Sequence, residues 1–228
     1  MPNKIVIPTI TPYSLLQVVT ESKKYLNYYN TIHFDVIDKS YGEPTYFNSV
    51  KVLEALQDYK KVLMHLMVEN PTSFILNNLF GFKNQKLLFI LPNKKVSILN
   101  VQALVKQQIS VGLSYELGEE FYLNTSVIPH LSELMFLPIT PGKTGNIADL
   151  SFLIKMEAFL DKNLSNLPNK LTISIDGGFN LNNYTEYLQT KANVIYANSF
   201  FKNKPLKQVI QDLRNINAYE NTNLSIQL

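Results

Sequence analysis

The chain has 228 residues, of which 46% are apolar and 17% are charged, and its formal net charge is +3. A disordered chain would be poor in apolar residues and rich in net charge, so this composition is typical of a folded protein. The positive charge comes almost entirely from lysine, because Arg214 is the only arginine. Base readout and bidentate phosphate binding both favour arginine, and we therefore expect no nucleic-acid partner.

The sequence contains no cysteine, which excludes disulfides, thiolate metal sites and cysteine nucleophiles. The segment from Met1 to Pro8 lacks the longer apolar region of a signal peptide. No stretch approaches the roughly 18 consecutive apolar residues of a membrane span. We therefore expect a cytoplasmic protein without a membrane partner.

Short apolar runs alternate with longer segments of helical spacing along the chain. The runs are nearly continuous, which is typical of strands buried on both faces of a parallel sheet. The predicted strands are Ile5–Ile7, Ile32–Val36, Val62–Leu66, Leu87–Leu91, Ile109–Leu113, Leu134–Leu137, Leu171–Ile175 and Val194–Ala197. The predicted helices are Ser14–Tyr28, Val50–Tyr59, Ser73–Phe80, Val101–Gln107, Asp149–Leu160, Asn182–Gln189 and Leu206–Asn215, with the weakest helical pattern at Gly118–Ser126.

Strands that alternate with helices indicate βαβ units and a parallel sheet. Eight such units in 228 residues predict a single (β/α)8 TIM barrel, a closed parallel eight-stranded barrel covering residues 1–228. An open doubly wound sheet is the alternative, because the number of strands does not exclude it. We expect residues 218–228, which follow the last helix, to form a loose C-terminal tail.

Two histidines and two aspartates fall at the ends of predicted strands. His33 and Asp35 are two residues apart and so point to one face of the second strand. His65 lies in the third strand, and Asp176 ends the seventh. A lone strand histidine is more often a core residue, and an aspartate before two glycines is more often part of a turn. The placement of all four at one rim of a barrel instead favours a site for Zn, Mn, Fe or Co.

Three loops after the last three predicted strands suit an anion. They contain Pro141–Asn146, Gly177–Gly178 and Asn198–Ser199. Barrels often bind phosphate near strands seven and eight, where glycines let the backbone approach the anion closely. Turns use glycine in any case, so each loop alone is weak evidence. Lys143 fits either a phosphate contact or a solvated loop position.

At these positions the sequence resembles the ribulose-phosphate 3-epimerase family. The family's His-Val-Asp-Val-Met-Asp is similar to His33-Phe34-Asp35-Val36-Ile37-Asp38, and its Val-His-Leu-Met-Ile-Glu-Asn-Pro to Met64-His65-Leu66-Met67-Val68-Glu69-Asn70-Pro71. The family's Pro-Ser-Ile is similar to Pro8-Thr9-Ile10, and its Val-Asn-Pro-Gly to Ile139-Thr140-Pro141-Gly142. Its Val-Asp-Gly-Gly is similar to Ile175-Asp176-Gly177-Gly178, and its Ala-Gly-Ser to Ala197-Asn198-Ser199. The motifs follow in chain order from about residue 5 to 215, so they are jointly specific.

The resemblance implies an isomerase of the pentose phosphate pathway that converts D-ribulose 5-phosphate to D-xylulose 5-phosphate. By analogy, the catalytic acids are Asp35 and Asp176, which reach C3 of the ketose phosphate from opposite faces. The same analogy implies a divalent metal ion held by His33, Asp35, His65 and Asp176, which acts as a Lewis acid for the enediolate oxygen. We expect Zn first, with Fe(II), Mn and Co as alternatives. The substrate-binding residues that it implies are Thr9, Met67, Gly142, Lys143, Gly145, Gly177, Gly178, Asn198 and Ser199.

The sequence departs from the family at several substrate-facing positions. Ile37 and Leu137 replace methionines, which keeps apolar volume but loses the polarizable sulfur. Asn198 replaces a glycine at a phosphate-facing turn, and Tyr115-Glu116 stands where the family has Asn-Pro. These changes leave substrate identity and turnover open rather than the class of reaction.

Three other interpretations are considered. The same chemistry could act on a hexulose phosphate such as allulose 6-phosphate, or the chain could be a diverged, non-catalytic sugar-phosphate-binding barrel. Decarboxylation of the orotidine-phosphate type is disfavoured, because Ile37 and Ser40 replace the lysine and second aspartate of that motif. Barrels of this family commonly associate, so a homo-oligomer is compatible with the resemblance, although nothing in the sequence indicates an interface.

Overall fold

The computed structural model describes residues 4–78, 86–143, 145–202, 204–220 and 224–225. In this part of the chain, eight parallel strands run in the order β2 to β8 and then β1, and β1 pairs again with β2 to close the barrel. The closure confirms the predicted TIM barrel and excludes the open sheet. The strands are β1 (Lys4–Ile10), β2 (Thr31–Ile37), β3 (Lys61–Met67), β4 (Leu87–Pro92), β5 (Ser110–Glu116), β6 (Glu133–Leu137), β7 (Thr172–Asp176) and β8 (Val194–Ala197).

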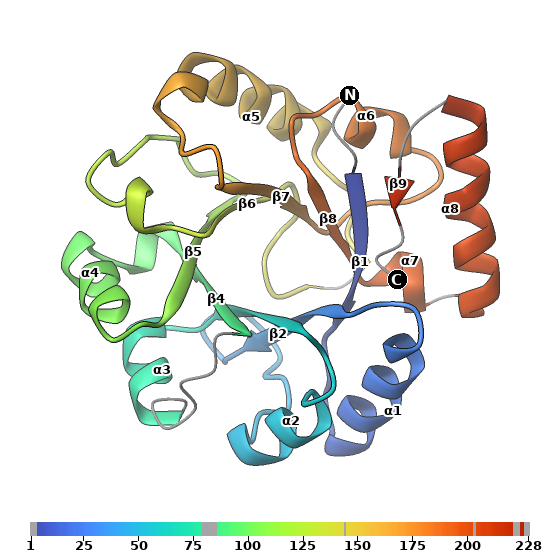
Figure 1. Cartoon of the computed structure of the whole chain (residues 1–228), viewed down its shortest axis with the longest axis horizontal. Helices are drawn as coiled ribbons and strands as arrows, with labels where there is room; N and C mark the ends of the chain where they lie inside the picture. Colours follow the sequence, from blue (N-terminus) through green and yellow to red (C-terminus); the bar gives the residue numbers. More distant parts are fainter. Residues whose placement is uncertain (1–3, 79–85, 144, 203, 221–223, 226–228) are drawn as a thin grey trace.

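Helices surround the strands on the outside of the barrel (Figure 1). They are α1 (Leu15–Leu26), α2 (Ser49–Ala55), α3 (Pro71–Asn78), α4 (Ile98–Lys106), α5 (Leu150–Asn163), α6 (Tyr184–Leu188), α7 (Ser199–Lys202) and α8 (Leu206–Glu220). Side-chain caps fix where several of them begin. Ser14 accepts from the backbone of Gln17 before α1, and Ser97 forms a capping box with Asn100 before α4. Two residues of the predicted third helix, 79 and 80, lie outside the described residues.

The weak helical pattern at Gly118–Ser126 does not form a helix in the structure, which describes this whole segment. Gly118 adopts a left-handed backbone with φ of 89°, and a 3-10 turn follows at η2 (Ile128–His130). Phe121 packs against Phe136 and Phe152, with ring centroids 5.3 and 5.0 Å apart. Aromatic packing between β6 and α5 therefore holds this connection in an irregular conformation.

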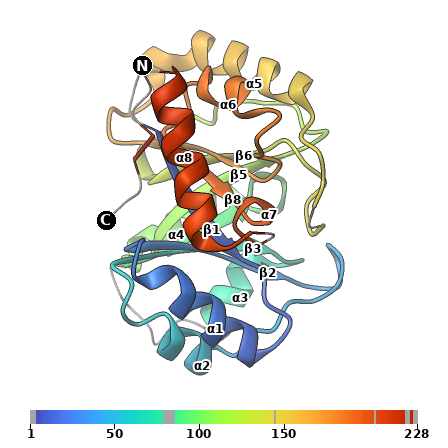
Figure 2. The same ribbon diagram turned by 90° about the vertical axis from the view of Figure 1, so that its right-hand side faces the viewer.

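Of residues 218–228, which we expected to form a loose tail, the structure describes 218–220 and 224–225. Helix α8 continues to Glu220, and the two-residue strand β9 (Leu224–Ser225) pairs in parallel with Lys4 and Ile5 of β1. The described pairing of β1 with β2 involves only Thr9 and Ile10. The first half of β1 thus leaves backbone groups that β9 can pair with. Residues 221–223 and 226–228 lie outside the described part. Figure 2 shows β9 beside α8.

Apolar side chains form two cores, one on each side of the barrel wall. The larger core lies between strands and helices and includes Phe34, Val36 and Phe136. The smaller core contains Ile7, Leu63, Leu88, Ile90, Met135, Leu137, Val194 and Tyr196. Successive strand residues point to opposite faces, so His33 and Asp35 share the interior with this second cluster.

Gly112 of β5 leaves room that the interior needs. A Cβ atom at this position would lie 2.6 Å from Cδ1 of Ile90 and 2.8 Å from the backbone oxygen of Glu133. We predict that Gly112→Ala lowers the free energy of unfolding by about 1–3 kcal/mol, measured by urea denaturation. Adding Ile90→Val, which deletes Cδ1, should recover part of that loss. Equal stability of Gly112→Ala and the parent would show that the neighbouring atoms shift to accommodate the added Cβ at little cost.

Candidate active site

The four residues that the sequence analysis grouped lie together at one end of the barrel. His33 and Asp35 come from β2, His65 from β3, and Asp176 is the last residue of β7. Both histidines are fully buried, while Asp35 and Asp176 are 8% and 7% exposed. One potential ligand atom from each residue lies within 4.8 Å of the other three. Strands far apart in the sequence thus deliver two imidazoles and two carboxylates to one point.

The facing atoms of this cluster suit a cation. Nδ1 of His65 is 3.2 Å from Oδ2 of Asp176 and 3.6 Å from Oδ1 of Asp35, and Nε2 of His33 is 4.0 Å from Oδ2 of Asp176. Among the described residues, His33 Nε2, Asp35 Oδ1 and both ring nitrogens of His65 have no hydrogen-bond partner. Unpaired buried polar atoms are costly, and a divalent cation would satisfy those that face the centre. This donor set suits Zn, Mn, Fe or Co.

The pKa shifts within the cluster also favour a positive charge at its centre. Burial lowers the pKa of His65, but Asp176 and Asp35 outweigh it and raise the pKa to about 9. Burial raises the pKa of Asp35, but the nearby histidines and the Thr11 hydroxyl hold it below its usual value. Burial also lowers the pKa of His33. The two carboxylates thus attract a positive charge, which either a proton on His65 or a metal ion can supply.

Other side chains orient the cluster. Oγ1 of Thr9 lies 3.0 Å from Nδ1 of His33, and the ring of Tyr196 stacks on His33 with centroids 4.4 Å apart and an angle of 18°. If Nδ1 donates to Thr9, the lone pair of Nε2 faces the centre of the cluster, as a metal ligand requires. Thr9, expected near substrate oxygens, thus also contacts a candidate metal ligand.

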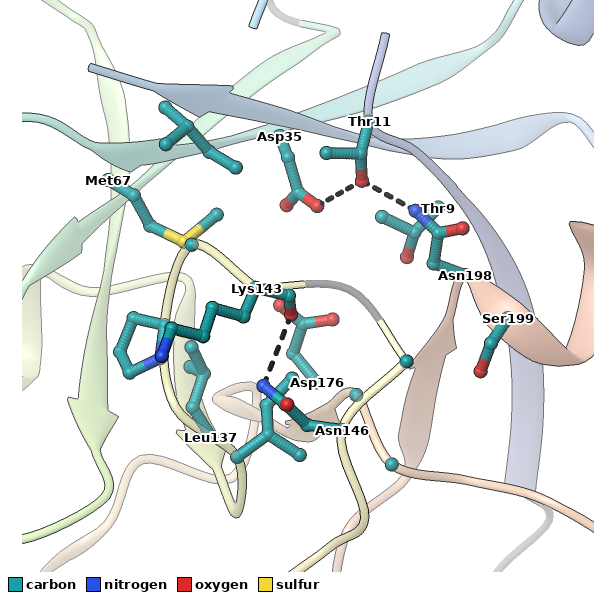
Figure 3. A pocket seen from close by; sticks show the side chains of 17 residues that line it. Thr9, Thr11, Asp35, Met67, Leu137, Lys143, Asn146, Asp176, Asn198 and Ser199 are labelled. Carbon is teal, nitrogen blue, oxygen red and sulfur yellow. Dashed lines mark hydrogen bonds between the residues drawn. The ribbon is translucent and has the colours of Figure 1, made fainter. Parts of the chain in front are cut away.

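A pocket opens directly beside the cluster (Figure 3). It is lined by Asp35 and Asp176, while His33 and His65 do not reach its surface. Every residue that the resemblance implied for substrate binding lines it, namely Thr9, Met67, Gly142, Lys143, Gly145, Gly177, Gly178, Asn198 and Ser199. The sequence analysis missed Thr11, although Thr9 and Thr11 are two residues apart, a spacing that places side chains on one face of an extended segment.

The loop after β6 crosses the mouth of the barrel. Gly142 has φ of 74°, and a Cβ there would overlap the backbone oxygen of Tyr41, so only glycine fits this contact. The side chain of Asn146 donates to the backbone oxygen of Thr140 at 3.2 Å. Lys143 is exposed and in Figure 3 extends toward Met67, away from Asn198 and Ser199. The loops after β2 and β6 therefore meet across the pocket.

The departure at Tyr115-Glu116 has a structural role at the rim. Glu116 ends β5 and is fully buried, and its Oε1 accepts a 2.9 Å hydrogen bond from the hydroxyl of Tyr41. Lys94 pairs with the other oxygen of Glu116. This buried carboxylate therefore anchors the loop after β2, which in turn contacts Gly142.

A second buried acid, Glu133, lies inside the barrel and escaped the sequence analysis. Its Oε1 accepts from Ser174 at 2.6 Å and from Tyr196 at 2.8 Å. Tyr196 stacks on His33, and Ser174 shares its strand face with Asp176, so Glu133 supports two members of the cluster. The signal in the sequence was a charged residue at the start of an apolar run, next to Leu134.

A family model described as the ribulose-phosphate 3 epimerase family matches residues 5–201 of this chain. The chain belongs to the ribulose-phosphate 3-epimerase family. No curated protein sequence matches it significantly. Membership confirms the resemblance seen in the motifs, and a cluster of two histidines and two aspartates that could hold a divalent metal is consistent with it.

Solved structures share the fold of this family member at low sequence identity. KGPDC from Streptococcus mutans is 9% identical, with a TM-score of 0.63 and coverage of 95% of this chain and 99% of that chain. Phosphoribosyl anthranilate isomerase from Thermus thermophilus is 12% identical, with a TM-score of 0.62 and coverage of 93% and 99%. 3-Keto-L-gulonate-6-phosphate decarboxylase from Vibrio cholerae is 10% identical, with a TM-score of 0.62 and coverage of 94% and 97%.

These likenesses support the barrel alone. Among the described residues, no helix combines the length and apolar character needed to cross a bilayer.

Glu133 gives a prediction about stability and pH. Burial raises its pKa above the usual 4.5, so the fold favours the protonated carboxyl, and stability should fall as pH rises from about 4.5 through the raised value. We predict that Glu133→Gln, which keeps an oxygen acceptor without the charge, is increasingly stabilised over the parent as pH rises, in urea unfolding from pH 4.5 to 8.

The matched variant is Glu133→Leu, which leaves the hydroxyls of Ser174 and Tyr196 unpaired. Compared with Glu133→Gln, it should be less stable by about 1–3 kcal/mol for each buried group at every pH. If the difference in the free energy of unfolding between the parent and Glu133→Gln does not vary with pH, the prediction is wrong.

Proposed function

We propose that this chain is a metal-dependent 3-epimerase of a ketose phosphate that interconverts D-ribulose 5-phosphate and D-xylulose 5-phosphate. The observation that carries the proposal is the pair Asp35 and Asp176, two carboxylates from different strands that line one pocket beside two histidines. A site that only binds a sugar phosphate needs no second acid, whereas inversion of a carbon centre needs an acid on each face. Family membership supports this class of substrate.

The two aspartates would carry the protons. In one direction, one carboxylate removes the proton from C3, and the electron pair of the broken C–H bond moves into an enediolate between C3 and C2. The other aspartate, which is protonated, then delivers its proton to the opposite face of C3, and the C2 carbonyl re-forms. Asp35 and Asp176 come from β2 and β7 and both line the pocket, which supports this exchange (Figure 3).

His33, Asp35, His65 and Asp176 would hold the metal ion, with Zn as the first candidate and Fe(II), Mn and Co as the others. When bound, it would supply a Lewis acid for the negative charge on the C2 oxygen. Thr9 and Tyr196 would keep the imidazole of His33 aligned for this role.

The remaining pocket residues would recognise the rest of the substrate. Ile37, Met67 and Leu137 form an apolar part of the lining, which excludes water from the reacting carbons. Gly142, Gly145, Gly177 and Gly178, with Ser199 and the backbone of Asn198, would surround the phosphate.

Proton NMR in deuterated water tests the proposal. The protein, with added Zn, Mn, Fe(II) or Co, is incubated with D-ribulose 5-phosphate or with allulose 6-phosphate. Loss of the C3 proton signal together with formation of the epimer is the expected result for the pentulose phosphate. Faster exchange with the hexulose phosphate would reassign the substrate, and no exchange with either sugar under any metal would favour a diverged, non-catalytic barrel.

Asp176→Asn should remove one proton carrier while preserving shape. We expect the rate of epimerisation to fall by about 10²–10⁴-fold, because the amide cannot accept or return the C3 proton. The rate is measured in the NMR assay, with circular dichroism to verify that the variant folds. Unchanged turnover would exclude Asp176 from catalysis.

His65→Ala should weaken metal binding. The variant loses an imidazole that water replaces poorly, so we expect metal affinity to fall by at least about tenfold. Metal content after equilibrium dialysis measures the effect. His130→Ala is the matched control, because His130 is exposed in η2 and outside the cluster. Equal metal content in His65→Ala and the parent would remove His65 from the site.

A further inference from the structure

Thr11 lies between a catalytic acid and the turn after β8. It follows the end of β1 directly, and the residue is 1% exposed. Its hydroxyl donates to Oδ2 of Asp35 at 2.6 Å, and the side-chain amide of Asn198 donates to the Thr11 oxygen at 2.6 Å (Figure 3). A chain of two short hydrogen bonds thus joins Asn198 to Asp35.

The chemistry of the three groups determines which of them donates in each hydrogen bond. An ionised carboxylate only accepts hydrogen bonds, so the single proton of the Thr11 hydroxyl must point to Asp35. The Thr11 oxygen can then only accept, and the group on its other side must be a donor. The NH2 end of the Asn198 amide is such a donor, whereas its carbonyl end would repel the Thr11 oxygen. One orientation of each group therefore satisfies the chain.

These two hydrogen bonds also fix the rotation of the Asp35 carboxylate. With Oδ2 held by Thr11, Oδ1 faces the histidines, at 3.7 Å from Nδ1 of His33 and 3.6 Å from Nδ1 of His65. Oδ1 has no hydrogen-bond partner among the described residues, so it is the oxygen left for a cation. A carboxylate free to rotate would present either oxygen and would lose this preorganisation.

We propose that Thr11 and Asn198 are a positioning pair that orients Asp35 for the metal ion and the substrate. The side chain of Asn198 acts on Asp35 through Thr11, and not on the phosphate, because one hydrogen of its NH2 group donates to Thr11 and fixes the amide in this orientation. The phosphate is left to Ser199 and the backbone of the glycine turns. The role of Asp35 at C3 rests on the proposed function, whereas its orientation toward a cation does not.

Four variants separate this proposal from a phosphate role for Asn198. Thr11→Val removes the hydroxyl at constant shape, and Thr11→Ser keeps it. Asn198→Ala removes the amide, and Ser199→Ala is the matched control on the neighbouring residue. Each protein is measured for Co(II) affinity and visible Co(II) spectrum, for affinity for inorganic phosphate, and for kcat and KM in the epimerase assay.

We expect Thr11→Val to weaken Co(II) binding by about tenfold and to change the Co(II) spectrum, while Thr11→Ser stays near the parent. Asn198→Ala should shift Co(II) affinity and kcat in the same direction, with phosphate affinity and KM unchanged. Ser199→Ala should show the reverse pattern. Because Asn198 acts through Thr11, the double variant Thr11→Val, Asn198→Ala should be no worse than Thr11→Val alone.

Unchanged Co(II) affinity and spectrum in Thr11→Val would overturn the proposal, and so would weaker phosphate binding with unchanged kcat in Asn198→Ala. If Thr11→Val does not fold, Asn198→Ala and Ser199→Ala are compared in Co(II) affinity, kcat, phosphate affinity and KM, and the proposal stands only if the two variants show the opposite patterns given above. A parent that binds Co(II) but exchanges no C3 proton would refute the epimerase function alone, since the Co(II) measurements still test the pair. A parent that binds no Co(II) would overturn the positioning role as well.

Discussion

The burial of two carboxylates within a few ångströms of each other is the constraint on which this site depends. Asp35 and Asp176 repel each other and lose hydration where they lie, so a compensating positive charge must accompany them. The structure supplies two imidazoles at the same point, and the raised pKa of His65 shows how strongly the pair attracts a proton. A divalent cation would meet the same need, and its binding would then stabilise the folded state of this end of the barrel.

Hydrogen bonds around the cluster keep its members in a fixed arrangement. Thr9 and Tyr196 hold the ring of His33, and Thr11 holds Asp35. Glu133, another buried acid, lies deeper in the barrel and accepts a hydrogen bond from the hydroxyl of Tyr196. It therefore helps to hold the ring that stacks on His33. A site with this many fixed partners is preorganised, because little rearrangement is needed when charge develops on a substrate.

The mouth of the pocket shows how departures from the family motifs fit together. Glu116, which stands in a segment where the family has Asn-Pro, anchors Tyr41, and the backbone of Tyr41 contacts Gly142 of the loop after β6. Asn198, which replaces a glycine, reaches Thr11. Glu116 and Asn198 thus each have a specific hydrogen-bond partner in the structure, close to the group of two histidines and two aspartates.

The sequence by itself determined the alternation of strands and helices and placed His33, Asp35, His65 and Asp176 on predicted strands, because apolar runs and the two-residue period of a strand are local properties. The tertiary structure decided that the sheet closes into a barrel and which residues surround the cluster. Thr11 and Asn198 are 187 positions apart, Tyr41 and Glu116 are 75 apart, and Glu133 and Tyr196 are 63 apart. A periodic pattern says which face a side chain occupies, but the register and closure of the barrel set its depth and its neighbours. The irregular Gly118–Ser126 segment has the same origin, since packing of Phe121 between β6 and α5 overrides its weak local preference for a helix.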